Sequence, residues 1–116
     1  MLSKQQNPSL PYFTPDIRKC IILGNFDYSA IRFGDQNKKG FADLLEVQQD
    51  MQVFKERIQQ YGFDSNFDIL EMTNFTFNDV KKVFLRSFKE VNSNADLGRK
   101  TLTIVYYGGH GMMRDN

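Results

Sequence analysis

The sequence predicts an α/β fold in which three parallel strands alternate with two helices, in the order β-α-β-α-β. Two patterns support this prediction. Residues 18–24 and 101–107 are short apolar runs of the length of buried strands, whereas segments 42–61 and 76–91 carry apolar residues at spacings of three and four. Strands that alternate with helices favour right-handed crossovers and a parallel sheet between two helix layers. We therefore expect a three-layer α/β/α arrangement.

Composition limits the classes of protein to consider. The 116 residues suffice for one small domain, and the net charge of +1 shows no basic excess that would indicate nucleic acid binding. No apolar run approaches the roughly 20 residues of a membrane helix, and the N-terminus lacks the pattern of a signal peptide. The single cysteine, Cys20, excludes an internal disulfide. We expect a cytoplasmic protein that needs no cofactor and binds neither nucleic acid nor membrane.

The N-terminal part of the sequence predicts a leader, a strand and a loop. Residues 1–16 contain all three prolines and are expected to form an extended leader before a domain of residues 17–116. The run "RKCIILG", 18–24, predicts the first strand, with Cys20 as a small apolar core residue. Glycine, asparagine and charged residues then predict a long loop over 25–40.

The first helix is predicted from about Ala42 to Tyr61, with Gly62 as its C-terminal stop. Its apolar face consists of residues at helical spacing: Leu44, Val47, Met51, Phe54, Ile58 and Tyr61. Such a face packs against the sheet, so this helix should contribute to the core.

A weaker strand and a second helix follow. Residues 66–72 predict the second strand, and Thr76 or Asn78 can cap a helix whose apolar stripe continues to Val91. The polar segment "NSNADLGRK", 92–100, predicts a surface loop.

The third strand carries the most informative motif. Its β-branched and aromatic residues, 101–107, run directly into Gly108-Gly109-His110-Gly111. Chemistry gathers at the carboxyl ends of strands in parallel sheets, and the glycines let the backbone turn sharply there. The only histidine of the chain is therefore a candidate general base, although an ordinary loop histidine is the simpler interpretation. One histidine and one distant cysteine are poor support for a metal site.

Four segments together resemble the caspase-like cysteine peptidases, the family of caspases and metacaspases. "CIILGNFDY" is similar to the family's first strand and turn, and "DLLEVQQDMQVFKERIQQYGF" to its first helix. "TNFTFNDVKKVF" is similar to the start of its second helix, and "TIVYYGGHG" to the strand that ends in Ser/Gly-His-Gly. The resemblance covers residues 18–116, is closer to metacaspase-like members than to animal caspases, and implies a sheet with the first strand central.

The resemblance implies a cysteine endopeptidase that acts on a peptide or protein. In the family the histidine pairs with a cysteine on the next strand end, roughly 50 residues downstream in caspases. That position lies beyond Asn116, so we expect residues 1–116 to be the N-terminal half of a catalytic domain, inactive alone and partnered by the C-terminal half. The third strand would then be an unpaired edge, which predicts self-association through it.

The resemblance also implies roles for individual residues. His110 would be the general base and acid of a Cys-His dyad, and Gly111 would lend its backbone N–H to the oxyanion hole. Gly108 and Asp50 match positions of the first specificity pocket, with Asp50 as its acidic residue. On pattern alone Asp50 is a solvated helix residue. The pocket arginine of caspases has no match, because Arg32 lies too far ahead of Asp50.

Two other classes stay open. The first is a non-catalytic caspase-like module that acts through protein contacts, and a cysteine about 50 residues after Asn116 would favour the enzyme over it. The second is a receiver-like or nucleotide-binding α/β domain. A receiver needs an acidic residue at the end of the third strand, where Gly-Gly-His-Gly stands instead.

Overall fold

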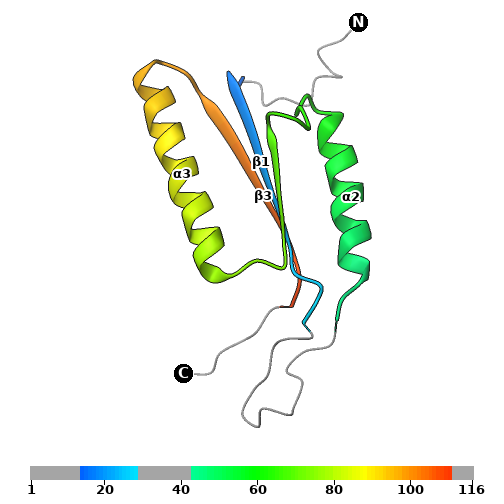
Figure 1. Cartoon of the computed structure of the whole chain (residues 1–116). Helices are drawn as coiled ribbons and strands as arrows, with labels where there is room; N and C mark the ends of the chain where they lie inside the picture. Colours follow the sequence, from blue (N-terminus) through cyan, green and yellow to red (C-terminus); the bar gives the residue numbers. More distant parts are fainter. Residues whose placement is uncertain (1–13, 29–42, 111–116) are drawn as a thin grey trace, which may run out of the picture.

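The computed structural model describes residues 14–28 and 43–110, which form a three-stranded parallel sheet with one helix on each face (Figure 1). The elements are β1 (Ile17–Gly24), α2 (Glu46–Gln59), β2 (Ile69–Thr73), α3 (Phe77–Asp96) and β3 (Thr101–Gly108). The strand order is β2-β1-β3, so β1 is central. The predicted α/β class, the β-α-β-α-β order and the central first strand are confirmed.

The register of the sheet brings all three strand ends to one edge. Ile17 at the start of β1 lies opposite Thr101 of β3. Gly24 at its end lies opposite Thr73 of β2 and Gly108 of β3. Because the strands are parallel, their carboxyl ends and the segments that follow them meet at the same edge of the sheet.

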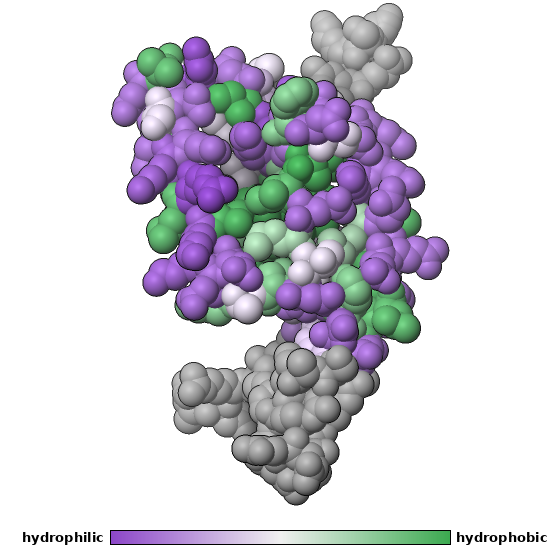
Figure 2. Space-filling view, viewed as in Figure 1, coloured by the Kyte–Doolittle hydropathy of each residue, from purple (hydrophilic) through white to green (hydrophobic). Residues whose placement is uncertain are grey.

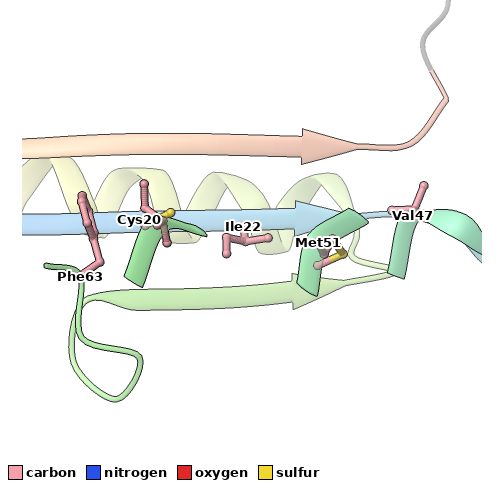
Figure 3. Close-up of a cluster of buried hydrophobic side chains, with 6 residues drawn as sticks. Cys20, Ile22, Val47, Met51 and Phe63 are labelled. Atoms are coloured by element: carbon pink, nitrogen blue, oxygen red, sulfur yellow. The ribbon is translucent and has the colours of Figure 1, made fainter. Parts of the chain in front are cut away.

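The core lies between the sheet and α2. Cys20 and Ile22 of β1 are fully buried and form one cluster with Met51 and Val47 of α2 (Figure 3). The buried cluster is completed by Ile58 and Phe63.

The buried α2 positions, Val47, Met51 and Ile58, recur at spacings of four and seven and confirm this part of the predicted apolar face. The prediction that Tyr61 lies on the same face was wrong, because the helix ends at Gln59 and Tyr61 is 47% exposed.

The opposite face of the sheet is covered more loosely by α3. No residue of α3 is buried, and both Leu85 and Phe88 are more than half exposed. A groove of about 470 Å³ between α3 and the sheet is lined by Ile21, Phe84, Ser87, Phe88, Val91, Thr103 and Val105. Figure 2 shows hydrophobic residues gathered between the two helices, whose outer surfaces are mostly hydrophilic. Burial is therefore concentrated on the α2 side.

The N-terminus of α3 is fixed by a capping box. The Thr76 hydroxyl accepts a hydrogen bond from the Asp79 backbone N–H at 3.2 Å, and the Asp79 carboxylate accepts one from the Thr76 backbone N–H at 3.1 Å. The Thr76 backbone N–H, and after it the Thr76 hydroxyl, lower the pKa of Asp79. Of the two predicted caps, Thr76 is the one used.

Two elements begin later than predicted. The first helix begins at Glu46 rather than near Ala42, because Leu44 donates its backbone N–H to the Phe26 carbonyl at 2.9 Å and is tied to the segment after β1. The second strand begins at Ile69 rather than Asn66, since the residues before it form a turn.

The prediction of a loop directly after Val91 was wrong for its first residues. The helix α3 continues to Asp96, and the Asn94 side chain donates to the Glu90 carbonyl one turn earlier at 2.9 Å. The chain turns only at Gly98, which has a φ of 77° and so adopts a left-handed conformation that favours glycine. The sequence prediction missed this end of the helix because its residues are mostly polar.

Two predicted segments fall largely outside the described residues: the leader, 1–16, is described only from residue 14, and the loop, 25–40, only up to residue 28. The end of the leader is described. Asp16 accepts from the Lys100 backbone N–H through its side chain at 2.8 Å and donates its own N–H to the Lys100 carbonyl at 2.9 Å. These bonds extend the contact between the start of β1 and the start of β3.

Ile22→Ala should lower the free energy of unfolding by about 2–4 kcal/mol, because it removes a fully buried side chain from the central strand. Chemical denaturation followed by circular dichroism measures the change. Leu85→Ala, at a position 51% exposed on α3, is the matched control and should stay within about 0.5 kcal/mol. Equal losses in the two variants would contradict the position assigned to the core.

Candidate active site

The segment after β3 makes a turn that only glycine accommodates. Gly109 has a φ of 156°, and a Cβ there would collide with the Tyr107 hydroxyl and lie 2.9 Å from the Tyr28 hydroxyl. His110 follows at the carboxyl edge of the sheet and is half-buried. The structure thus confirms that glycine allows a close approach of the backbone just before the histidine.

Gly108 lies in contact with α2. A Cβ on Gly108 would be 3.0 Å from the Cγ1 atom of Val47, so the bare backbone lets the start of α2 approach the end of β3. The Gly108 carbonyl accepts a hydrogen bond from the Asn25 backbone N–H at 2.9 Å. This bond continues the contact between β1 and β3 one residue beyond the sheet.

Tyr28 is a site residue that the sequence analysis did not single out. It is 5% exposed, and its hydroxyl oxygen accepts a hydrogen bond from the backbone N–H of His110 at 3.0 Å. The same hydroxyl donates to the Asn25 carbonyl at 3.0 Å. The Tyr28 and His110 rings meet edge to face, with centroids 4.7 Å apart at 66°. The sequence did give one indication of this role: Tyr28 lies four residues after the first strand and therefore at the same edge of the sheet as His110.

Tyr107 holds the other side of the His110 backbone. Its hydroxyl donates to the His110 carbonyl at 3.0 Å. Partial desolvation, with a further contribution from the neighbouring Tyr28 hydroxyl, raises the pKa of Tyr107 above its ordinary value. Tyr107 therefore remains a neutral hydrogen-bond donor throughout the neutral pH range, and the His110 backbone is held by two tyrosine hydroxyls.

Asn74 fixes the segment that leads from β1 to Tyr28. Its side-chain oxygen accepts hydrogen bonds from the backbone N–H groups of Phe26 and Asp27, each at 3.1 Å. Its own backbone N–H donates to the Gly24 carbonyl at 2.9 Å, and its φ of 48° lies in the left-handed region. The end of β2 thereby positions the segment that carries the histidine contact.

Of the other residues predicted for the site, only Asp50 lies within the described residues. Asp50 is exposed and lies three residues after Val47, one helical turn from the contact with Gly108. It therefore lies on the part of α2 nearest the carboxyl edge. Gly111 and Arg32 lie outside the described residues.

Cys20, as predicted, is a core residue. Its side chain is fully buried in β1, and desolvation by burial raises the pKa of its thiol to about 11. It lies opposite Ile104, which is four strand residues before Gly108, a separation of about 13 Å along the strand. Since His110 lies further still, Cys20 does not serve as the nucleophile of this edge.

Two further findings concern the described residues only. In the ranges 14–28 and 43–110, no group of three or more His, Cys, Asp or Glu side chains is arranged to hold a metal ion. In the same ranges, no helix has the length and apolar character needed to cross a membrane. The chemical groups at the carboxyl edge include the His110 imidazole, the Tyr28 and Tyr107 hydroxyls and the Asp43 carboxylate.

Comparison with known proteins assigns the chain to a family. Residues 17–116 match the family model described as caspase domain. The chain belongs to the caspase domain family. No curated protein and no solved structure matches it. The resemblance inferred from the sequence is confirmed, and the caspase domain is a peptidase domain whose family membership indicates protein substrates. The roles of His110, Gly111, Gly108 and Asp50 stay predictions.

In this caspase domain, Asn74→Ala should lower the free energy of unfolding by about 1–3 kcal/mol, because two backbone N–H groups lose their acceptor and alanine is strained at this φ. Chemical denaturation gives the stability, and amide exchange at Phe26 and Asp27 gives the local effect.

Two control variants at Asn74 separate the causes. Asn74→Gly relieves the backbone strain but lacks the acceptor, and Asn74→Asp keeps an acceptor. The expected order of stability is Asp, then Gly, then Ala. Unchanged amide exchange at Phe26 and Asp27 in the Gly variant would show that the side chain does not hold this segment.

Proposed function

We propose that the chain supplies the histidine half of a cysteine endopeptidase site, with His110 as general base and acid. The observation that carries the proposal is the placement of His110 at the carboxyl edge, with its backbone N–H and carbonyl held by Tyr28 and Tyr107. Chemistry gathers at this edge in parallel sheets, and a general base needs a fixed position. The caspase family supplies the reaction class.

The proposed reaction is acyl transfer through a thioester. The His110 imidazole takes the proton of a cysteine thiol, and the thiolate attacks the carbonyl carbon of the scissile peptide. The Gly111 backbone N–H donates to the oxyanion that forms. The imidazolium then protonates the leaving amine, and His110 next activates the water that hydrolyses the thioester.

The proposed nucleophile is a cysteine that follows residue 116. The only cysteine within the 116 residues is Cys20, which is buried and has a raised thiol pKa, whereas nucleophilic cysteines are accessible and have lowered pKa values. A free thiol of this kind is usual in a reducing compartment, and we propose the cytoplasm as the location.

The proposed partner is the C-terminal half of the same domain. In the described sheet β3 pairs with β1 on one side only, and an edge strand with unpaired backbone groups accepts another strand. We propose that the segment with the cysteine pairs there. Without it, a second copy of the chain would use the same edge, which gives self-association through β3.

A second candidate function is a non-catalytic module that acts through protein contacts. The apolar groove between α3 and the sheet favours it, since Phe84, Phe88 and Val105 line a surface suited to a partner. This candidate needs no histidine chemistry. Substitution of His110 therefore distinguishes the two functions, because partner binding would survive it and peptide hydrolysis would not.

In a longer form that contains the cysteine, His110→Ala should lower kcat/KM for peptide hydrolysis by about 10²–10⁴-fold, the usual contribution of a general base. Fluorogenic peptides measure the rate, and circular dichroism checks that the variant folds. Lys89→Ala, at an exposed position of α3, is the control and should leave the rate unchanged. A loss of less than about tenfold in His110→Ala would exclude the proposed role.

The specificity proposed for the site is metacaspase-like, with cleavage after Arg or Lys rather than after Asp. Its support is the position of Asp50 one helical turn from the contact between Val47 and Gly108. A carboxylate pairs with a guanidinium through charge-assisted hydrogen bonds and repels an acidic side chain. Asp50 is exposed here, so the pairing depends on the pocket wall that the remaining half of the domain would add.

Asp50→Ala in the longer form should reduce kcat/KM for a peptide with Arg before the scissile bond by about 10-fold or more, with little change for an uncharged residue there. Asp50→Glu, which keeps the charge, is the matched control and should retain the preference for Arg. A preference for Asp in the parent enzyme, or a preference for Arg that Asp50→Ala leaves intact, would show that Asp50 does not set the pocket.

A further inference from the structure

Tyr28 and His110 are 82 residues apart in the chain and meet at the carboxyl edge. Tyr28 belongs to the segment after β1, and His110 to the segment after β3. The phenol ring of Tyr28 is almost wholly buried, which is unusual for a residue outside the regular elements. A buried polar ring in contact with the single histidine calls for a physical explanation.

We propose that Tyr28 is a positioning residue that sets the orientation of the His110 imidazole, an inference that rests on the proposed role of His110 as the general base. Tyr28 does this through two contacts. Its hydroxyl accepts the His110 backbone N–H, which fixes the main chain at the histidine, and the ring packs edge to face on the imidazole, which restricts side-chain rotation.

The Tyr28 hydroxyl closes a ring of hydrogen bonds between the two strand ends. The His110 N–H donates to the Tyr28 hydroxyl, which donates to the Asn25 carbonyl, and the Asn25 N–H donates to the Gly108 carbonyl. These bonds measure 3.0, 3.0 and 2.9 Å. Tyr28 thus connects the His110 backbone to the ends of both β1 and β3.

Tyr28 is itself held at its backbone. Its N–H donates to the Asp43 carboxylate at 2.7 Å, a charge-assisted bond to the segment just before α2. Asn74 fixes the two residues that precede it. Because the ring is supported from both β2 and the approach to α2, a shift of Tyr28 would be transmitted to the imidazole.

Tyr107→Phe is the matched control for Tyr28→Phe. Tyr107 also makes one hydroxyl hydrogen bond to the His110 backbone, but its side chain is about half exposed, so water can replace the lost donor. Tyr28→Phe instead removes the buried hydroxyl that accepts the His110 N–H. The two variants therefore differ in burial and not in the chemical group removed.

The first test uses the 116-residue chain and needs no activity. Because His110 is the only histidine, its imidazole signals in NMR spectra are unambiguous. In the wild type we expect nuclear Overhauser contacts between the Tyr28 ring and the His110 imidazole, and their absence would overturn the proposal. Tyr28→Phe should speed exchange of the His110 amide at least tenfold and shift the imidazole resonances, whereas Tyr107→Phe should change both less.

The second test uses the longer form that contains the cysteine. A displacement of the base by about 1 Å costs roughly 10²-fold in rate, so Tyr28→Phe should lower kcat by about 10- to 100-fold with KM nearly unchanged. Tyr28→Leu, which also removes the ring contact, should lose more, and Tyr107→Phe less. A Tyr28→Phe variant with unaltered His110 signals and unaltered kcat would overturn the proposal. If His110→Ala leaves hydrolysis unchanged, the proposed role of His110 as general base is wrong. The NMR contacts between Tyr28 and His110 then still test whether Tyr28 orients the imidazole.

Discussion

The pairing of β1 with a neighbour on both sides is the constraint on which the rest of the structure depends. Its last five residues, Cys20–Gly24, are all buried, whereas β2 and β3 contain no buried residue. A strand with this environment must be apolar on both faces, which explains the uninterrupted run of aliphatic residues in the sequence. Its register with β2 and β3 then determines where every other strand residue lies.

The candidate site is located where the carboxyl ends of the three strands meet. The parallel register brings Gly24, Thr73 and Gly108 side by side, and side chains from the segments beyond them connect the three ends. Asn74, which follows β2, accepts a hydrogen bond from the segment after β1. Tyr28, which lies in that segment, accepts a hydrogen bond from His110. The histidine is thus positioned by short polar contacts at an edge whose location is set by buried apolar ones.

Local patterns predicted much of this arrangement. The aliphatic run of β1, the apolar stripe of α2 and the glycines around His110 each depend on neighbours close in sequence, so they could be read directly. The contact of Tyr28 could not, because it joins positions 82 residues apart. The extension of α3 to Asp96 was missed because helix propensity of polar residues is weak evidence. Asp50 is exposed, and its role in a specificity pocket stays a prediction.

Native-state hydrogen exchange of the 116-residue chain tests the dominance of β1 most directly. We expect the amides of Cys20–Gly24 to exchange slowest, through global unfolding, and the amides of α3 to exchange sooner because no residue of that helix is buried. Protection of α3 equal to or greater than that of β1 would show that β1 does not organise the fold, since the helix would then be held as firmly as the strand.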